Sequence, residues 1–196
     1  MYHQMRLTLD LISNELENAV FYDFTSSYPE KTAFEGEEDL ITFLLATGKG
    51  LKVVRYYLAS PEGGRVHKVM VGARHARNVD TTVDYREQEM SLRDLVREEW
   101  DFPEYLSGVI AQDHAAEVIA TNIRENSLEF SYGYADEQSG QADHAYEWRR
   151  AWTEKSLPFL VRLKMDFMIT GPAPRVVTMS KDVLIPQGFW GKQQGT

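Results

Sequence analysis

The segment from Val161 to Ile169 constrains the fold more than any other part of the chain. Apolar residues occupy every second position, and the residues between them are mostly charged. The apolar positions are Val161, Leu163, Met165, Phe167 and Ile169. A two-residue period is typical of an antiparallel strand with one face in a core and the other towards water. The chain is therefore expected to build an antiparallel sheet around this segment.

The N-terminal segment has a different period and predicts a helix over residues 1–21. Its apolar residues recur at spacings of three and four, which places them on one side of a helix. They are Met5, Leu9, Ile12, Leu16, Ala19 and Val20. A helix of this length is marginal in isolation. We therefore expect the apolar stripe to pack against the rest of the chain.

The opposite side of the predicted helix carries a second apolar spot. At about 100° per residue, Leu7 and Leu11 fall far from the stripe, beside the uncharged Asn14 and Asn18. Single exposed leucines are common on protein surfaces. A second contact face for a partner helix explains the same pattern. These four residues are therefore the candidate partner-binding residues, and we refer to them together as the outer face.

Further strands are predicted where short apolar runs lie between turn signals. They cover residues 40–45, 52–58, 65–71, 79–85, 117–123, 128–134 and 175–185. A short helix is expected over residues 91–100, with Ser91 as its N-cap.

The expected fold class is α+β, with a long N-terminal helix packed on mainly antiparallel sheets. Residues 1–196 are expected to form one soluble domain, with a helix at 1–21, a sheet-rich body at 34–186 and a flexible tail at 187–196.

Composition excludes several kinds of function. The formal net charge is −9, and such a surface repels phosphate backbones, so nucleic-acid binding is disfavoured. The chain has no cysteine, which excludes disulfides, cysteine-ligated metals and thiol nucleophiles. No apolar run approaches the roughly 18 residues of a membrane span.

No pattern in the sequence points to catalysis or to a cofactor. The histidines, His3, His67, His75, His114 and His144, have no metal-ligand spacing. A nucleophile elbow and phosphate-binding glycine motifs are also missing. We therefore expect no enzymatic activity and no cofactor.

Two clusters allow a binding function beside a simpler structural one. Asp136, Glu137 and Asp143 could coordinate calcium through carboxylates, but a polar hairpin tip explains them equally well. Trp148 and Trp152 could form a carbohydrate platform, although large aromatic residues more often cover the edge of a core. Packing is the favoured interpretation of the two tryptophans.

The order of several elements resembles the J-type minor pseudopilins of type II secretion. The similar elements are Leu9–Val20, Phe34-Glu35-Gly36, Leu40–Phe43, Val54-Arg55-Tyr56-Tyr57-Leu58, Phe130–Tyr134, Trp148–Trp152, Leu157-Pro158 and Val161–Ile169. No single element is specific, but together they extend from about Met5 to Gly188. The resemblance implies an N-terminal helix packed on antiparallel sheets.

The resemblance also implies a function without a cofactor. Members of this family are structural components at the tip of the pseudopilus, on the periplasmic face of the bacterial inner membrane. They act in protein secretion through helix–helix contacts with the I- and K-type minor pseudopilins. The family has a leader and an apolar anchor before the helix, and the sequence printed here shows neither. We therefore expect this sequence to be the periplasmic part of such a protein, trimmed of its leader and anchor.

Two other functions remain open from the sequence. One is a minor pilin of a type IV pilus or of a competence system, which belongs to the same superfamily. The other is a small-ligand-binding module, in which a helix and a curved sheet enclose an apolar molecule. Such a module would need a pocket of roughly 300 Å³ or more.

Overall fold

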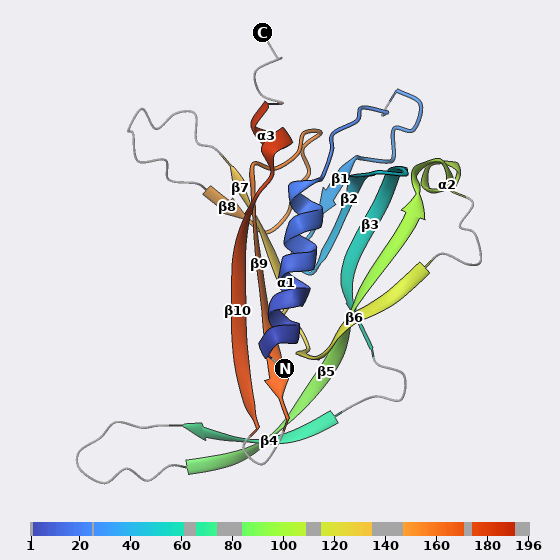
Figure 1. The fold of residues 1–196 in the computed structure, drawn as a ribbon. Coiled ribbons are helices and arrows are strands. Elements are labelled where there is room, and N and C mark those ends of the chain that lie inside the picture. Colours follow the sequence, from blue (N-terminus) through green and yellow to red (C-terminus); the bar gives the residue numbers. More distant parts are fainter. Residues whose placement is uncertain are drawn as a thin grey trace.

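The computed structural model describes residues 2–24, 26–60, 66–73, 84–108, 115–134, 147–170 and 174–190. The protein is mostly β, and its main sheet curls around the N-terminal helix α1 (Tyr2–Glu17) (Figure 1). The strands are β1 (Phe34–Gly36), β2 (Leu40–Thr47), β3 (Gly50–Ala59), β4 (Val66–Ala73), β5 (Asp84–Asp101), β6 (Ala115–Arg124), β7 (Glu129–Tyr134), β8 (Glu147–Arg149), β9 (Leu160–Ile169) and β10 (Arg175–Leu184). Two short helices follow β5 and β10, namely α2 (Phe102–Ser107) and α3 (Pro186–Trp190).

The sheet follows the order β1-β2-β3-β5-β6-β9-β7-β8, and every neighbouring pair is antiparallel. Strand β9 is the junction of this path. One of its edges pairs with β7 and then, at Ile123 and Phe167, with β6. Its other edge pairs with β10 along the whole of that strand. The alternating segment therefore lies at the centre of the sheet, as its period predicts.

The sheet curls far enough for the two ends of the path to meet. Gly36 of β1 pairs with Trp152, just after β8, and the Trp152 N–H donates to the Gly36 carbonyl at 2.8 Å. The Tyr132 ring of β7 lies against Gly36, where an added Cβ would approach the ring to 2.3 Å. Its hydroxyl donates to the Glu37 carbonyl at 2.9 Å. A side chain at position 36 would thus prevent this junction from closing.

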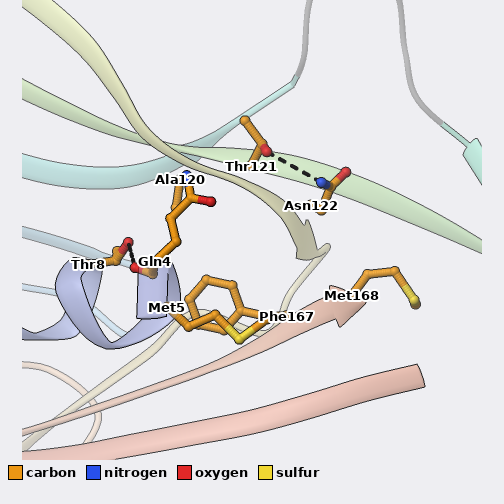
Figure 2. Close-up of a pocket in the computed structure, with 8 residues that line it drawn as sticks. All are labelled: Gln4, Met5, Thr8, Ala120, Thr121, Asn122, Phe167 and Met168. Atoms are coloured by element: carbon orange, nitrogen blue, oxygen red, sulfur yellow. Dashed lines mark hydrogen bonds between the residues drawn. The ribbon is translucent and has the colours of Figure 1, made fainter. Parts of the chain in front are cut away.

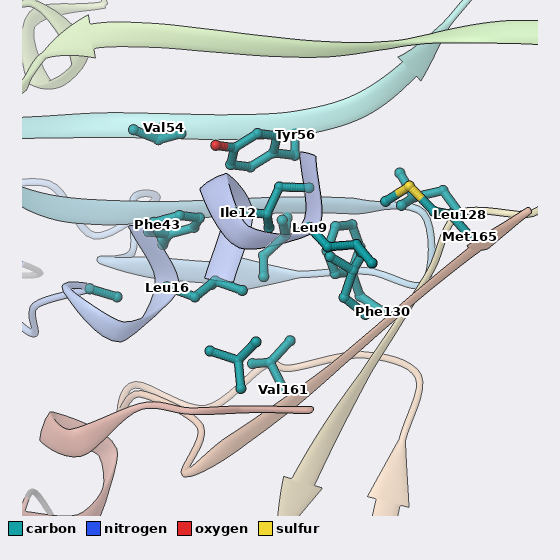
Figure 3. Close-up of a cluster of buried hydrophobic side chains, with 14 of the residues drawn as sticks. Leu9, Ile12, Leu16, Phe43, Val54, Tyr56, Leu128, Phe130, Val161 and Met165 are labelled. Atoms are coloured by element: carbon teal, nitrogen blue, oxygen red, sulfur yellow. The ribbon is translucent and has the colours of Figure 1, made fainter. Parts of the chain in front are cut away.

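Helix α1 lies on the concave side of the curled sheet, and the predicted stripe is confirmed as its buried side. Leu9, Ile12 and Leu16 are buried together with residues from strands on both sides of the helix. Figure 3 shows these three side chains between Val54 and Tyr56 of β3 on one side and Val161 of β9 on the other. One hydrophobic core therefore connects the helix to both halves of the sheet.

The expected α+β class with a long N-terminal helix was wrong, because the protein is mostly β and its helix is short. Helix α1 has 16 residues and ends at Glu17, whereas it was expected to continue to residue 21. After that point Ala19 pairs with Leu45, and the Val20 N–H donates to the Leu44 carbonyl at 2.9 Å. Ala19 and Val20 extend the apolar stripe in the sequence, but they pack from an extended backbone.

The short helix expected over residues 91–100 was also wrong, because this segment belongs to the long strand β5. Leu95 lies in the core around α1, whereas Trp100 belongs to a cluster on the other face of the sheet. Because both faces of the strand are covered, Leu92, Leu95, Val96 and Trp100 are all buried. Their spacing imitates one helical stripe.

The other predicted strands agree with the structure where it describes them. Strands β2, β3, β4, β6, β7, β9 and β10 overlap the predicted ranges. The range 79–85 lies mostly outside the described residues, which resume with Asp84 in β5.

Candidate partner-binding face

One flank of helix α1 is held to the sheet by a half-buried ion pair. The Arg97 guanidinium of β5 donates to the Glu15 carboxylate from Nη2 at 2.8 Å and from Nε at 3.1 Å. The fully buried Tyr56 hydroxyl of β3 donates to the same carboxylate. A second carboxylate, Glu99, accepts from Arg97 at 2.6 Å and also pairs with Lys52. Two strands thus contact a single glutamate of the helix.

The pKa shifts of this cluster follow from its burial and charges. Burial raises the pKa of the Tyr56 phenol well above its usual range, and the nearby Glu15 charge raises it further. Burial by itself would lower the pKa of Arg97, but hydrogen bonds to Glu15 and Glu99 outweigh it and raise that pKa. Tyr56 therefore stays neutral and Arg97 stays charged at ordinary pH.

The other flank of α1 faces β10 through exposed polar contacts. The Lys181 ammonium donates to the Asp10 carboxylate at 2.8 Å, and this bond lowers the pKa of Asp10. The Arg175 guanidinium donates to the Tyr2 hydroxyl at 3.0 Å. Together with the pair on the other flank, these contacts fix the rotation of the helix about its axis.

The outer face points away from the sheet as a consequence. Leu7 is 53% exposed and Leu11 is 38% exposed. Asn14 and Asn18 are exposed beside them, and the Asn18 amide donates to the Asn14 carbonyl at 2.7 Å. The structure thus brings all four candidate residues onto one uncharged surface. Their role in partner binding remains a prediction.

The histidines and acidic residues considered for chemistry give no site within the described part. His75, His114 and His144 lie outside the described residues, and so do Asp136, Glu137 and Asp143. Within the described ranges, no group of three or more His, Cys, Asp or Glu residues could hold a metal ion.

The two tryptophans have packing roles. Trp152 is buried, with its ring centroid 4.5 Å from that of Tyr134, and its Nε1 donates to the Ser156 carbonyl at 2.6 Å. Trp148 is half-buried, and the Arg162 guanidinium carbon lies 4.1 Å from its ring centroid. The Trp152 ring is thus enclosed and presents no open platform for a sugar, whereas the Trp148 ring is covered on one side by a cation.

A small pocket lies between α1, β6 and β9, next to the outer face (Figure 2). Its lining residues are Gln4, Met5, Thr8, Ala120, Thr121, Asn122, Phe167 and Met168. Its volume is about 40 Å³, far below the roughly 300–1,000 Å³ of sites for small organic ligands. This pocket does not have the size that a ligand-binding module requires.

Sequence reasoning missed the cluster that orients the outer face. No pattern in the sequence indicated that Arg97 and Tyr56 lie against Glu15. These residues are 82 and 41 positions away from Glu15. Only the pairing of β3 with β5 brings them side by side.

No helix in the described ranges is long and apolar enough to cross a membrane. Comparisons with protein-family models, with curated proteins and with solved structures found no match.

Proposed function

We propose that this chain is a J-type minor pseudopilin, a structural and assembly component at the tip of a type II secretion pseudopilus. In this role it acts in protein secretion on the periplasmic face of the bacterial inner membrane and catalyses no reaction. Its partners are the I- and K-type minor pseudopilins. The outer face of α1 carries the proposal, because it is apolar, uncharged and held in one orientation.

The sequence resemblance indicates which secretion system the chain would belong to. The outer face indicates how the chain would bind its partners. A helix that only covered its own sheet would gain nothing from exposed Leu7 and Leu11. Burying a leucine side chain fully contributes about 1.5–3 kcal/mol. Since 53% of Leu7 and 38% of Leu11 remain exposed, covering both would contribute roughly 1.5–3 kcal/mol in total. That free energy corresponds to a change in affinity of about tenfold or more.

The proposal is tested by placing charge on the outer face. The Leu7→Glu/Leu11→Glu variant is expected to bind the soluble parts of the I- and K-type pseudopilins at least tenfold more weakly. Its melting temperature should change little, because both side chains point away from the core. Isothermal titration calorimetry measures the affinity, and a thermal melt followed by circular dichroism measures the stability.

A matched control uses apolar residues of similar exposure elsewhere. Val118 on β6 is 53% exposed and Leu184 on β10 is 48% exposed. The Val118→Glu/Leu184→Glu variant carries the same added charge and is expected to bind like the unmodified protein. Equal loss of binding in both variants would show a general charge effect. Unchanged binding in the Leu7/Leu11 variant would refute the docking role of the outer face.

A further inference from the structure

One edge of strand β10 carries no neighbouring strand among the described residues. β10 pairs with β9 over its whole length, from Arg175 opposite Ile169 to Leu184 opposite Leu160, without a shift of register. No described strand pairs with its other edge, which we call the free edge (Figure 1). An exposed strand edge presents a row of N–H and C=O groups that can pair with a further strand.

The hydrogen bonds to β9 show which residues of β10 turn their backbone groups to the free edge. The Ile185 N–H donates to the Phe159 carbonyl at 2.9 Å, and this pair continues the register of the two strands. In an antiparallel ladder, alternate residues turn N–H and C=O towards the partner strand, and the residues between them turn these groups away. The free edge therefore presents the backbone groups of Val176, Thr178, Ser180, Asp182 and Leu184.

The usual protections of a strand edge are missing from β10. Such edges are commonly protected by a proline, a bulge or a charged side chain. The ten residues of β10 include no proline, and their register with β9 has no bulge. The charged side chains of the strand are bonded to α1 and β9, namely Arg175 to Tyr2, Lys181 to Asp10 and Asp182 to Arg162. These contacts hold the side chains on the two faces of the sheet and leave the free edge open.

We propose that the free edge pairs with the free edge of a second copy of this chain. The two β10 strands run antiparallel, and the two-fold axis passes between Ser180 of one copy and Ser180 of the other. Thr178 then lies opposite Asp182 of the second copy, and Val176 lies opposite Leu184. Leu184 is 48% exposed in the single chain, and this cross-strand pair covers part of it. The inference does not rest on the proposed function, because the free edge and the outer face are different surfaces.

Charge selects this register from its neighbours. An axis at Lys181 or at Asp182 would bring two identical charges together, which is destabilising in a cross-strand pair. An axis two residues before Ser180 would place Arg175 opposite Lys181. An axis one residue before it would place Asp182 opposite the apolar Val176. The axis at Ser180 avoids all of these pairs and includes the whole strand.

The first test measures the self-association of the unmodified protein by sedimentation velocity. Each copy has a formal net charge of −9, which opposes association at low ionic strength. Dimer formation should therefore become stronger in about 0.5 M NaCl, where the Debye length is about 4 Å, than in dilute buffer. A chain that sediments as a monomer at every concentration in high salt would overturn the inference.

Single cysteines test the register, since the chain has no cysteine of its own. Ser180→Cys places two thiols opposite each other, with about 5.5 Å between their Cα atoms, which a disulfide can span. Oxidation is expected to give a covalent dimer. The matched control is Asp182→Cys on the same edge, whose two copies would lie about 13 Å apart along the strands and should not cross-link. Equal cross-linking of both variants, or none of Ser180→Cys, would contradict the register.

Charge at the axis gives a second test of the same pairing. Ser180→Lys and Ser180→Glu each place like charges opposite each other, so each variant alone should dimerise less tightly than the unmodified protein. An equimolar mixture pairs lysine with glutamate and should dimerise at least about threefold more tightly than either variant alone. Ser180 is exposed, so a thermal melt should show both variants folded. A mixture no tighter than its components would count against the axis.

The outcomes separate this inference from the proposed function. The Leu7→Glu/Leu11→Glu variant should still dimerise in high salt, because its substitutions lie outside the free edge. A protein that dimerises through Ser180 but binds neither pseudopilin would refute the proposed function alone. A protein that binds them and stays monomeric by itself would refute the pairing of β10 alone.

Discussion

Replacing Arg97 by methionine is expected to destabilise the protein by leaving a carboxylate without its counter-ion. The Glu15 and Arg97 side chains are only 14% and 13% exposed. In the Arg97→Met variant, Glu15 retains the Tyr56 hydroxyl as a hydrogen-bond donor but has lost its charged partner. Glu99, the other carboxylate on Arg97, still has Lys52 at 3.3 Å. The loss of stability therefore comes mainly from the unpaired carboxylate of Glu15.

The magnitude follows from the burial of the pair. Removing one partner of a fully buried ion pair costs about 3–5 kcal/mol. Since both side chains retain some contact with water, we expect the lower end, about 3 kcal/mol in the free energy of unfolding. For a domain of this size, 1 kcal/mol shifts the melting temperature by about 2–4 °C, which gives a decrease of roughly 6–12 °C.

Urea unfolding followed by tryptophan fluorescence measures the change, because Trp100 and Trp152 are buried. The decisive comparison is Glu15→Gln in the Arg97→Met background. This second change removes the unpaired charge and keeps an acceptor for Tyr56, so it should restore most of the lost stability. A loss below 0.5 kcal/mol in Arg97→Met, or no recovery in the double variant, would refute the reasoning.

A surface ion pair provides the control for this prediction. Lys181 and Asp10 connect the other flank of α1 to β10, and their side chains are 36% and 53% exposed. Exposed pairs contribute about 0–1 kcal/mol. Lys181→Met should therefore lower the free energy of unfolding much less than Arg97→Met does in the same assay.

Two further predictions concern the contact between Gly36 and Tyr132 and the contribution of Asp182 to stability at low pH. Gly36→Ala places a Cβ 2.3 Å from the Tyr132 ring, so the free energy of unfolding should decrease by about 1–3 kcal/mol or more. Tyr132→Leu in the same chain should relieve part of that cost, and strict additivity in a double-mutant cycle would contradict a direct clash. The hydrogen bond from Arg162 lowers the pKa of Asp182, so its contribution is present above the unfolded pKa of about 3.9 and disappears as the pH falls through the lower folded value. Because both side chains are over 40% exposed, Asp182→Asn should remove at most about 1 kcal/mol at pH 7 and nothing at pH 2, and a larger loss in acid than at neutral pH would contradict this assignment.

Sequence periodicity predicted the elements whose apolar positions share one face. The stripe of α1 and the alternating apolar positions of β9 are local patterns, because they turn one side of each element to the core, although Asp166 and Met168 on the other face of β9 are buried as well. The same pattern correctly separated the buried Leu9 and Ile12 from the exposed Leu7 and Leu11. Where both faces of a strand are covered, as in β5, the spacing of its apolar residues no longer distinguishes a strand from a helix. Leu95 and Trp100 face different clusters, so their spacing predicted a helix where the protein has a strand.

The proposal of a type II secretion system rests on the sequence resemblance to pseudopilins, because the comparisons with known proteins found no matching family. The sequence by itself determined which residues of α1 meet the core and which meet water. Only the tertiary structure decided how short that helix is, because the chain after Glu17 gives its backbone hydrogen bonds to β2. It also placed Arg97 beside Glu15 and Trp152 beside Gly36. These contacts join residues distant in sequence through strand pairing and sheet curvature, and no local period contains that information.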